Sequence, residues 1–284
     1  MTSCIITVIK DEHFYLDEFL SYHLNLGINH IFVIEDCISK THKNITDKYN
    51  NVTLYNVLDL WDTNEEKKYI YSRKIHRFKM QNTYLKKAYW FIKSHYDYDW
   101  MFAIDCDEYI TLNDSYTLDD IFRQFDSYDA VILRWQNYGA NGLIYKPDYS
   151  KQKIVNTYTK KIGYQTRTDT DKYTIKTLYN LNKYKDEFYF SMHRPKDTIA
   201  NWCMTDFSQD YSHYLFDKIY LRHYITKSWE DYIIKLKVRG MFYRRHRTYD
   251  SFFDMNPDML DKKEELIKIS DDIINKHIYK KENN

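Results

Sequence analysis

The first part of the chain alternates short apolar runs with amphipathic segments, and this pattern constrains the fold more than any other feature. Between the runs, residues 11–27 repeat apolar side chains at helical spacing and end on Gly27, and residues 68–95 contain no proline or glycine. Four apolar, β-branched runs are typical of buried strands: residues 4–10, 30–36, 52–60 and 100–105. Strands alternating with helices predict an α/β fold with a mainly parallel central sheet.

Acidic side chains follow three of these runs: Glu12, then Asp36, then Asp105, Asp107 and Glu108 within four positions. In open α/β sheets, ligands bind at the carboxyl ends of the strands. Carboxylates this close repel one another and are rarely buried without partners, so we expect a positive group among them. The chain lacks a GxGxxG loop and has only five glycines, so metal and cationic side chains are expected to hold any phosphate.

The motif Asp105-x-Asp107 suits a hard divalent cation at the end of a buried strand. One carboxylate can bind Mn²⁺ or Mg²⁺, and the other a ribose hydroxyl or a water of the ion. A surface turn with solvated acids would give the same pattern. A phosphohydrolase of the haloacid dehalogenase type also has DxD after an apolar strand, but that motif begins near the N-terminus and continues with Gly and Thr or Val, whereas Glu108 follows here.

The later part of the chain is less regular. Residues 218–240 run from a strand into a helix, with Thr226 or Ser228 as the expected N-cap, and an amphipathic helix, or two short ones, is expected from Pro257 on. Further strands, in part antiparallel, are expected in three runs: AVILRW (130–135), KYTIKTLYNL (172–181) and EFYFSMHRP (187–195).

The charge balance limits the classes of partner. The chain has 42 Lys and Arg against 41 Asp and Glu, so no global field directs it to nucleic acid or membrane. Its four cysteines lack CxxC spacing, which argues against a zinc site, and the absence of a long apolar run predicts a cytoplasmic protein. The basic, aromatic run 235–247 is expected to be a phosphate-facing flap or a solvated helix end, with a peripheral membrane contact as the alternative.

Five ordered segments between residues 4 and 240 resemble GT-A-fold glycosyltransferases of the family 2-like and family 92-like group. IDCDEYI resembles that group's Asp-x-Asp-Glu-Phe-Ile metal motif, and RWQNYGANG its Trp-x-x-Phe-Gly segment. HRP (193–195) and Gln81 also fit, and LRHYITKSWEDYIIKLKVRG resembles the signature His-Tyr-x-Thr-Lys-Ser near the end of the catalytic domain. The opening VIKDEHFYLDEFLSYHLNLGINHIFVIED matches at Lys10, Glu12, Glu18, His23, Gly27 and Asp36. Asp11, Phe19 and Tyr138 depart from the usual Asn, Trp and Phe, which leaves the substrate open.

The resemblance implies a GT-A fold, Rossmann-like and built for nucleotide-diphospho-sugars. It implies a catalytic domain over 1–240, with a nucleotide-binding half at about 1–110 and an acceptor half at about 111–240, followed by a helical extension over 241–284. The implied activity is metal-dependent transfer of a sugar, of hexosyltransferase type, from a nucleotide diphosphate donor, with UDP-sugar preferred, to a hydroxyl of a glycan, lipid-linked or protein acceptor. A non-catalytic domain of the same fold that binds carbohydrate or a partner protein is the alternative.

The resemblance also implies a donor site. Asp107 would hold Mn²⁺ or Mg²⁺ between the phosphates, with Asp105 on the ribose or the ion, and His223 as third ligand. Lys227 and Arg77 would contact phosphate, and Lys10, Glu12 and Asp36 the nucleoside. Each has a plainer interpretation: a buried structural histidine for His223, solvated cations for Lys227 and Arg77, and an ordinary strand-end acid for Asp36.

The acceptor side is less defined. If the reaction inverts the anomeric centre, a carboxylate must deprotonate the acceptor hydroxyl, and Asp197 and Asp206 are the candidates. A retaining reaction needs no such base. Four aromatic side chains are expected to line the sugar, or else to pack in the core: Trp135, Tyr138, His193 and Trp202.

Overall fold

The computed structural model describes residues 1–10, 12–36, 41–60, 77–162, 175–184, 190–193, 202–204, 218–238 and 248–282. Of residues 77–82, 202–204, 238 and 278–282 only the backbone is described. The chain forms two compact units, each made of two segments: residues 1–135 with 167–221, and residues 136–166 with 222–284. The domain boundaries inferred from the sequence remain a prediction.

The described strands are β1 (Ser3–Ile9), β2 (His30–Glu35), β3 (Val52–Asn56), β4 (Trp100–Ala103), β5 (Glu108–Leu112), β6 (Ala130–Asn137), β7 (Ile175–Asn180), β8 (Trp202–Met204) and β9 (Ile219–His223). Helices of the first unit are α1 (Leu16–Asn25), α2 (Lys43–Thr46), α4 (Arg77–His95) and α5 (Leu118–Phe125). Those of the second are α6 (Ile154–Thr157), α7 (Trp229–Ile233), α8 (Tyr249–Met255) and α9 (Lys263–Glu282).

The strands form one sheet in the order β3-β2-β1-β4-β7-β6-β9-β5, with β8 beside β6. β1 runs parallel to both β2 and β4, and β2 runs parallel to β3. β7 then lies antiparallel to both β4 and β6. The prediction of an α/β fold with a mainly parallel sheet and carboxyl-terminal helices is therefore confirmed.

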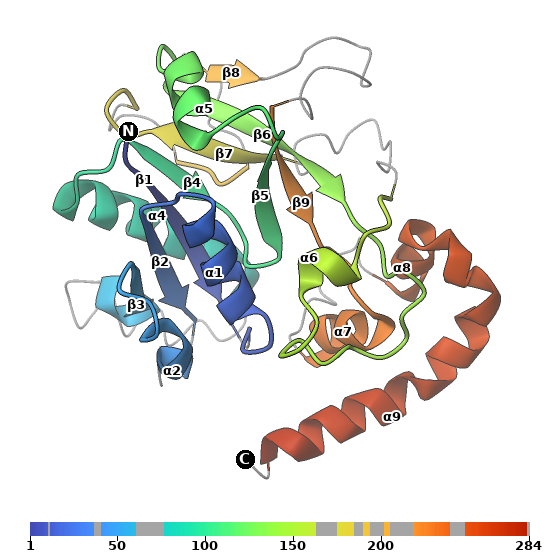
Figure 1. Cartoon of the computed structure of the whole chain (residues 1–284). Helices are drawn as coiled ribbons and strands as arrows, with labels where there is room; N and C mark the ends of the chain where they lie inside the picture. The colour runs from blue at the N-terminus through green and yellow to red at the C-terminus, as the bar shows by residue number, and fades with distance from the viewer. Residues whose placement is uncertain are drawn as a thin grey trace. The chain divides into compact units, whose positions relative to one another are not determined.

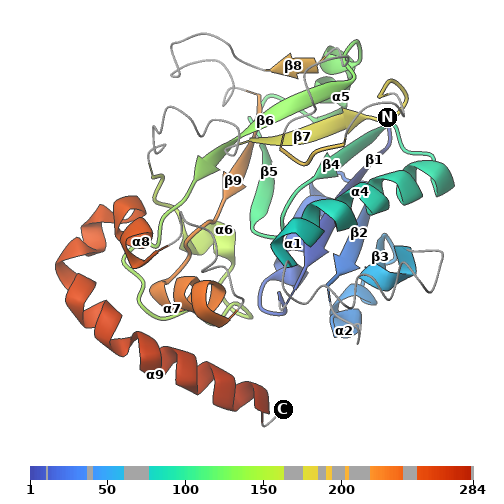
Figure 2. The ribbon, with the colours of Figure 1, turned by 180° about the vertical axis from the view of Figure 1, so that it is seen from behind.

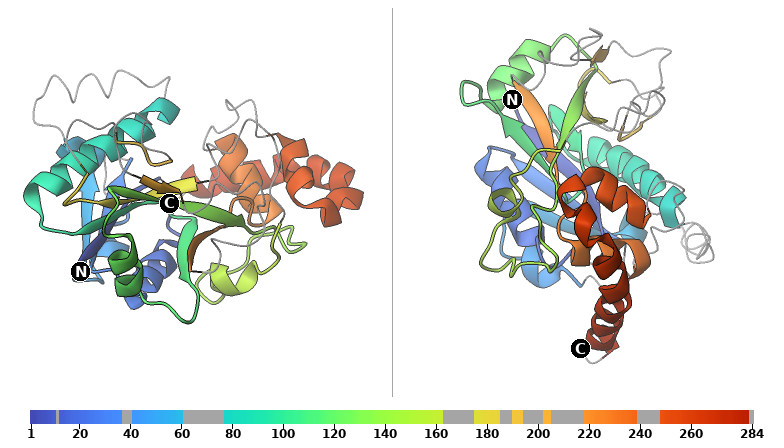
Figure 3. Two further views of the ribbon diagram at one scale, coloured as in Figure 1. Left: turned by 90° about the horizontal axis from the view of Figure 1, so that it is seen from above. Right: turned by 90° about the vertical axis from the view of Figure 1, so that its right-hand side faces the viewer.

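Helices cover both faces of the parallel part of this sheet. α4 packs on one face, where Leu85 and Tyr89 join Ile6 and Phe32 in one apolar core (Figure 2). α1 and α5 lie on the opposite face (Figure 3), where the Phe122 ring stacks on Trp100 with centroids 5.4 Å apart. Because both faces are covered, the strands read as continuous apolar runs rather than as alternating ones.

Local signals set the ends of the two helices on this second face. α1 stops before Gly27, whose φ of +106° is a conformation that favours glycine. α5 begins with a capping box: the Thr117 side chain accepts from the Asp120 N–H, and the Asp120 carboxylate accepts from the Thr117 N–H.

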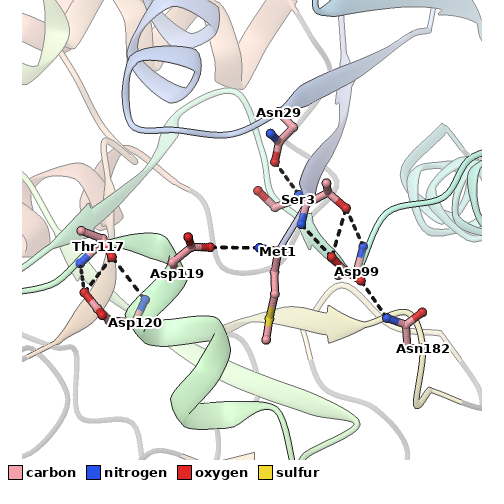
Figure 4. Close-up of polar contacts among 9 residues, drawn as sticks. Met1, Ser3, Asn29, Asp99, Thr117, Asp119, Asp120 and Asn182 are labelled. Carbon is pink, nitrogen blue, oxygen red and sulfur yellow. Dashed lines mark hydrogen bonds and ion pairs between the residues drawn. The ribbon is translucent and has the colours of Figure 1, made fainter.

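Polar contacts fix the amino ends of β1 and β4 (Figure 4). The Asp99 carboxylate accepts from the Thr2 N–H at 2.7 Å and from the Asn182 side-chain amide at 2.9 Å. The Asn29 side-chain oxygen accepts from the Ser3 N–H at 2.8 Å. These bonds hold the strands at the end opposite to the acidic residues.

The second unit has its own core, in which α7, α8 and α9 meet (Figure 1). Trp229 is fully buried there, and its indole N–H donates to the Leu266 carbonyl at 3.0 Å. Ser228 is the N-cap of α7, because its side chain accepts from the Asp231 N–H. The prediction of Thr226 or Ser228 is thus resolved in favour of Ser228. No helix in the described ranges is long and apolar enough to cross a bilayer.

Three expectations about secondary structure differ from the structure. The run 52–60 is not one strand, because Asn56 and Asp59 side chains accept backbone N–H groups and a 3₁₀ turn over Val57–Leu60 follows β3. Residues 190–193, the described part of the run EFYFSMHRP, are not in a strand. β5 was not predicted, although EYITL has strand composition. The start of the helix expected over 68–95 lies outside the described residues up to Arg77.

Candidate functional site

The carboxyl ends of β1, β2 and β4 share one edge of the sheet, because these strands are parallel and adjacent. Ile9 is opposite Glu35 in the register, and the Asp36 N–H donates to the Ile9 carbonyl at 2.9 Å. Lys10 and Asp36 therefore leave neighbouring strands at the same level. Asp105 follows β4 at this edge, as expected from the sequence.

The acids after β4 have a positive partner within the chain, and it is Lys176 of β7. Its ammonium lies 2.7 Å from Asp105 Oδ2 and 3.4 Å from Glu108 Oε2. The side chains of Lys176 and Glu108 are fully buried. Glu108 Oε2 also accepts from the Asp105 N–H at 2.8 Å, which closes the turn between β4 and β5. The counter-charge expected among these acids is thus present, and we refer to Asp105, Asp107, Glu108 and Lys176 as the acid cluster.

Burial and charge oppose each other in the acid cluster. Burial raises the pKa of Asp105, but the charge and hydrogen bond of Lys176, together with the charge of His193, outweigh it, and the pKa is lowered overall. Burial raises the pKa of Glu108 well above its usual value, and Lys176 offsets this only in part. Burial acts to lower the pKa of Lys176, yet the carboxylates of Asp105 and Glu108 raise it overall. Lys176 therefore stays charged and keeps Asp105 ionised.

Asp107 lies beside this ion pair and is only 6% exposed. Its charge acts on all three other members, raising the pKa of Asp105, Glu108 and Lys176. One oxygen of Glu108, Oε1, is buried and has no hydrogen-bond partner among the described residues. Lys176 therefore pairs with only one of the two oxygens of Glu108.

Two of the four aromatic residues expected to line the sugar adjoin the acid cluster. The Lys176 ammonium lies 5.8 Å from the centre of the Trp135 ring. His193 meets Trp135 edge to face, with ring centroids 5.9 Å apart, and its Nδ1 donates to the Ile175 carbonyl at 2.9 Å. Trp135 belongs to β6, and His193 is held against β7 by its bond to the Ile175 carbonyl.

A second buried carboxylate lies at the end of β2. Glu35 Oε1 accepts from the Thr41 hydroxyl at 2.6 Å and from His42 Nδ1 at 2.6 Å. His42 Nε2 accepts from the Glu12 backbone N–H at 3.1 Å. The His13 ring stacks on His42 with centroids 3.8 Å apart. We refer to Glu35 and His42 as the Glu–His pair; it joins the end of β2 to the segment after β1.

Three predicted site residues belong to the second unit. His223 is nearly buried, and its Nδ1 donates to the Asn137 side-chain oxygen at 3.1 Å, which leaves Nε2 as the unprotonated nitrogen of the neutral ring. Lys227 has a φ of +53°, is buried, and donates to the Tyr224 carbonyl at 3.1 Å, so it is not a solvated lysine. Tyr138 packs against Tyr224 with ring centroids 5.3 Å apart.

The other predictions cannot be placed. Asp197, Asp206 and residues 239–247 of the basic run lie outside the described residues, as do the side chains of Arg77 and Trp202. In the part of the chain that is described, no group of three or more His, Cys, Asp or Glu side chains is arranged to hold a metal ion. The third-ligand role of His223 accordingly stays a prediction.

A family model describes residues 1–275 as glycosyltransferase family 92. The chain belongs to that family. The resemblance inferred from the five sequence segments is therefore confirmed. No curated protein matches the chain significantly.

Several solved structures are similar to this chain. TarS of S. aureus is 20% identical over 50% of this chain and 22% of its own, with a TM-score of 0.32. HddC of Yersinia pseudotuberculosis is 9% identical over 72% and 89%, with a TM-score of 0.39. The 4-diphosphocytidyl-2C-methyl-D-erythritol synthase of Anaerococcus prevotii is 12% identical over 65% and 73%, with a TM-score of 0.31. These scores are too low to support an argument about function.

Sequence reasoning missed Lys176 and the Glu–His pair. Lys176 had a signal, since it is the one charged residue within the apolar β7 run. A lysine inside a buried strand requires an acidic partner, but the run does not say which one. Glu35 stands at the acidic end of the second apolar run, but nothing in the sequence pairs it with His42, because the stretch between them has neither helical nor strand periodicity.

Proposed function

We propose that the chain is a metal-dependent glycosyltransferase that moves a sugar, of hexose type, from a UDP-sugar to a hydroxyl of a glycan, lipid-linked or protein acceptor. The acid cluster at the carboxyl end of β4 is the observation that carries this proposal. Family membership supports the reaction class. The donor, the ion and the acceptor are parts of the proposal.

Two members of the acid cluster have the donor chemistry for a hard divalent cation such as Mn²⁺ or Mg²⁺. Asp105 and Asp107 offer carboxylate oxygens, the ligands these ions prefer. One oxygen of Asp105 is bonded to Lys176, so Asp107 is assigned the larger part of the ligation. When bound, the ion would neutralise charge developing on the leaving diphosphate and orient it. The resemblance adds His223 as a ligand.

The chain's own residues then have separate tasks. Lys176 keeps Asp105 ionised and fixed in direction, which leaves that carboxylate ready to accept a hydrogen bond from a ribose hydroxyl. Lys10, Glu12 and Asp36 are assigned to the nucleoside, since they leave β1 and β2 at one edge. Trp135 and His193 are assigned to the sugar, because aromatic faces suit sugar rings and these two adjoin the cluster. Lys227 is assigned to the diphosphate, and Asp197 and Asp206 remain the candidates for a general base.

The donor assignment can be tested by thermal shift with Mn²⁺ and a panel of nucleotides. A ligand that binds only the folded chain raises its melting temperature. We expect UDP to stabilise the protein more than ADP, GDP or CMP. Equal shifts for all four nucleotides would remove the support for uridine.

The metal assignment can be tested with Asp107→Asn, which removes the charge and keeps the shape. We expect loss of Mn²⁺-dependent cleavage of the UDP-sugar, with a melting temperature close to that of the wild type. Asp114→Asn is the matched control, because Asp114 is an exposed acid of the same unit seven positions further on. Full transfer by Asp107→Asn would take Asp107 out of the metal site. A wild type that binds UDP but transfers no sugar would favour a non-catalytic binding domain.

A further inference from the structure

The Glu–His pair defines the tautomer of His42. A backbone N–H can only donate, so His42 Nε2, which receives the Glu12 N–H at 3.1 Å, must be the unprotonated nitrogen. Nδ1 then carries the proton and donates it to Glu35 Oε1 at 2.6 Å. The His42 ring thus connects the Glu35 side chain at the end of β2 to the main chain after β1. Because Glu35 accepts the proton of Nδ1, Nε2 is the ring nitrogen that accepts a hydrogen bond.

The backbone N–H and carbonyl of Glu12 are both hydrogen-bonded. Its N–H is bonded to His42, and its carbonyl accepts from the Leu16 N–H at 3.1 Å at the start of α1. The next residue, His13, is exposed and stacks on the buried His42 ring with an interplanar angle of 13°. His42 therefore determines where the backbone of residues 12 and 13 runs beyond the sheet edge.

The cost of burying this pair suggests a purpose other than stability. Glu35 and His42 are no more than 1% exposed, and Glu35 Oε2 has no hydrogen-bond partner among the described residues. Buried ionisable groups are weak stabilisers, because desolvation offsets the hydrogen bond that they form. An apolar pair could fill the same volume, but it could not receive the Glu12 N–H.

We propose that His42 is a positioning residue for nucleotide binding. It holds the Glu12 backbone where the chain leaves β1, next to the proposed nucleotide site, and Glu35 fixes the tautomer of His42. The inference rests on the proposed function, since it assumes that a uridine nucleotide binds where β1 and β2 end. His42 itself touches the protein main chain and not the nucleotide.

A second buried histidine in the same unit provides a matched control. His23 Nδ1 donates to the Phe19 carbonyl at 2.8 Å, and its Nε2 accepts from the Ile110 N–H at 3.1 Å. His23 thus has the same tautomer and the same kind of acceptor bond as His42. His23 joins α1 to β5, and it makes no bond to the described residues of the segment after β1.

Two substitutions separate the two bonds of His42. In His42→Gln the amide reaches the position of Nε2, so an acceptor for the Glu12 N–H is kept and the bond to Glu35 is lost. In His42→Asn the shorter amide reaches the position of Nδ1, so the bond to Glu35 is kept and the acceptor is lost. Both variants lose one bond of a buried network, and we expect similar losses of stability in urea unfolding.

The two variants should differ in ligand binding. With UDP and Mn²⁺ in calorimetry, we expect His42→Asn to raise the Kd by about tenfold and His42→Gln by less than about threefold. In the free protein, hydrogen exchange of the Glu12 amide should be faster in His42→Asn than in His42→Gln. The corresponding His23 variants should lower stability and leave the Kd for UDP within about twofold of the wild type, since sites that share no partners act independently.

Equal Kd values for His42→Asn and His42→Gln would overturn the inference, as would a loss of UDP binding in the His23 variants of the same size. A wild type that binds UDP alongside either result would leave the proposed function standing. A wild type that binds no uridine nucleotide would overturn both.

Discussion

Two glutamates have fully buried carboxyl groups, Glu108 at the start of β5 and Glu35 at the end of β2, and each is paired with a different kind of side chain. Each side chain is fully buried, and each has one oxygen in hydrogen bonds and one without a partner among the described residues. Glu108 lies 3.4 Å from the Lys176 ammonium, whereas Glu35 accepts from His42 at 2.6 Å. Lysine brings a permanent charge, and histidine brings a second nitrogen that can bond elsewhere.

This difference shows that the acid cluster and the Glu–His pair contribute different properties to the site. Lys176 acts on Asp105, Glu108 and Asp107 through charge, so the acid cluster is an electrostatic arrangement. His42 is oriented by its bond to Glu35 and in turn accepts from the Glu12 N–H, so the Glu–His pair acts by positioning the backbone. The proposed function needs both, because a diphosphate requires charge and a nucleoside requires shape.

Among the substitutions that test this comparison, Lys176→Met is expected to have the largest effect on stability. Removing the lysine leaves buried carboxylates without their counter-charge, and we expect a loss of roughly 3–5 kcal/mol in the free energy of unfolding. Lys93→Met is the control, since Lys93 donates to the Tyr184 carbonyl and has a half-buried side chain in the same unit. Its loss should be about 1 kcal/mol. Equal losses in urea unfolding would show that charge is not what Lys176 contributes.

An intermediate effect is expected in the pH dependence of Glu108→Gln. The pKa of Glu108 is raised in the folded state, chiefly by burial, so above pH 4.5 the folded chain holds a proton that the unfolded chain has released. The free energy of unfolding of the wild type therefore falls as pH rises from 4.5 towards the folded pKa, by at most about 1.4 kcal/mol per pH unit. Glutamine does not titrate, so the variant should gain on the wild type over this range. Parallel curves in urea unfolding between pH 4.5 and 8 would contradict this.

The smallest effect is expected for Glu35→Gln. The amide oxygen of glutamine can still accept from His42 Nδ1, so the tautomer and the bond to Glu12 are kept. We expect a loss of about 1 kcal/mol in the free energy of unfolding and a nearly unchanged Kd for UDP. A loss as large as that of Lys176→Met would mean that the Glu–His pair also depends on charge, and the comparison would fail.

Much of the fold could be predicted from the sequence, because β1 to β4 are apolar runs, with helical segments between β1 and β2 and between β3 and β4. The position of Asp105 and Asp107 at the sheet edge followed from the same argument. The turn after β3 could not be predicted, since Asn56 and Asp59 compete with the strand through local side-chain bonds. The link to Lys176 could not be predicted either, because it joins residues 71 positions apart through an antiparallel strand order that apolar runs do not specify.

The insertion of β7 next to β4 has a consequence for how the enzyme is made. The carboxylates are synthesised by residue 108, but the ammonium that neutralises them is added only when residue 176 leaves the ribosome. Until then a nascent amino-terminal fragment carries mutually repelling acids at the end of an otherwise complete parallel sheet. The acid cluster is thus incomplete until β7 has been synthesised, and a shortened chain ending before β7 would lack its internal cation.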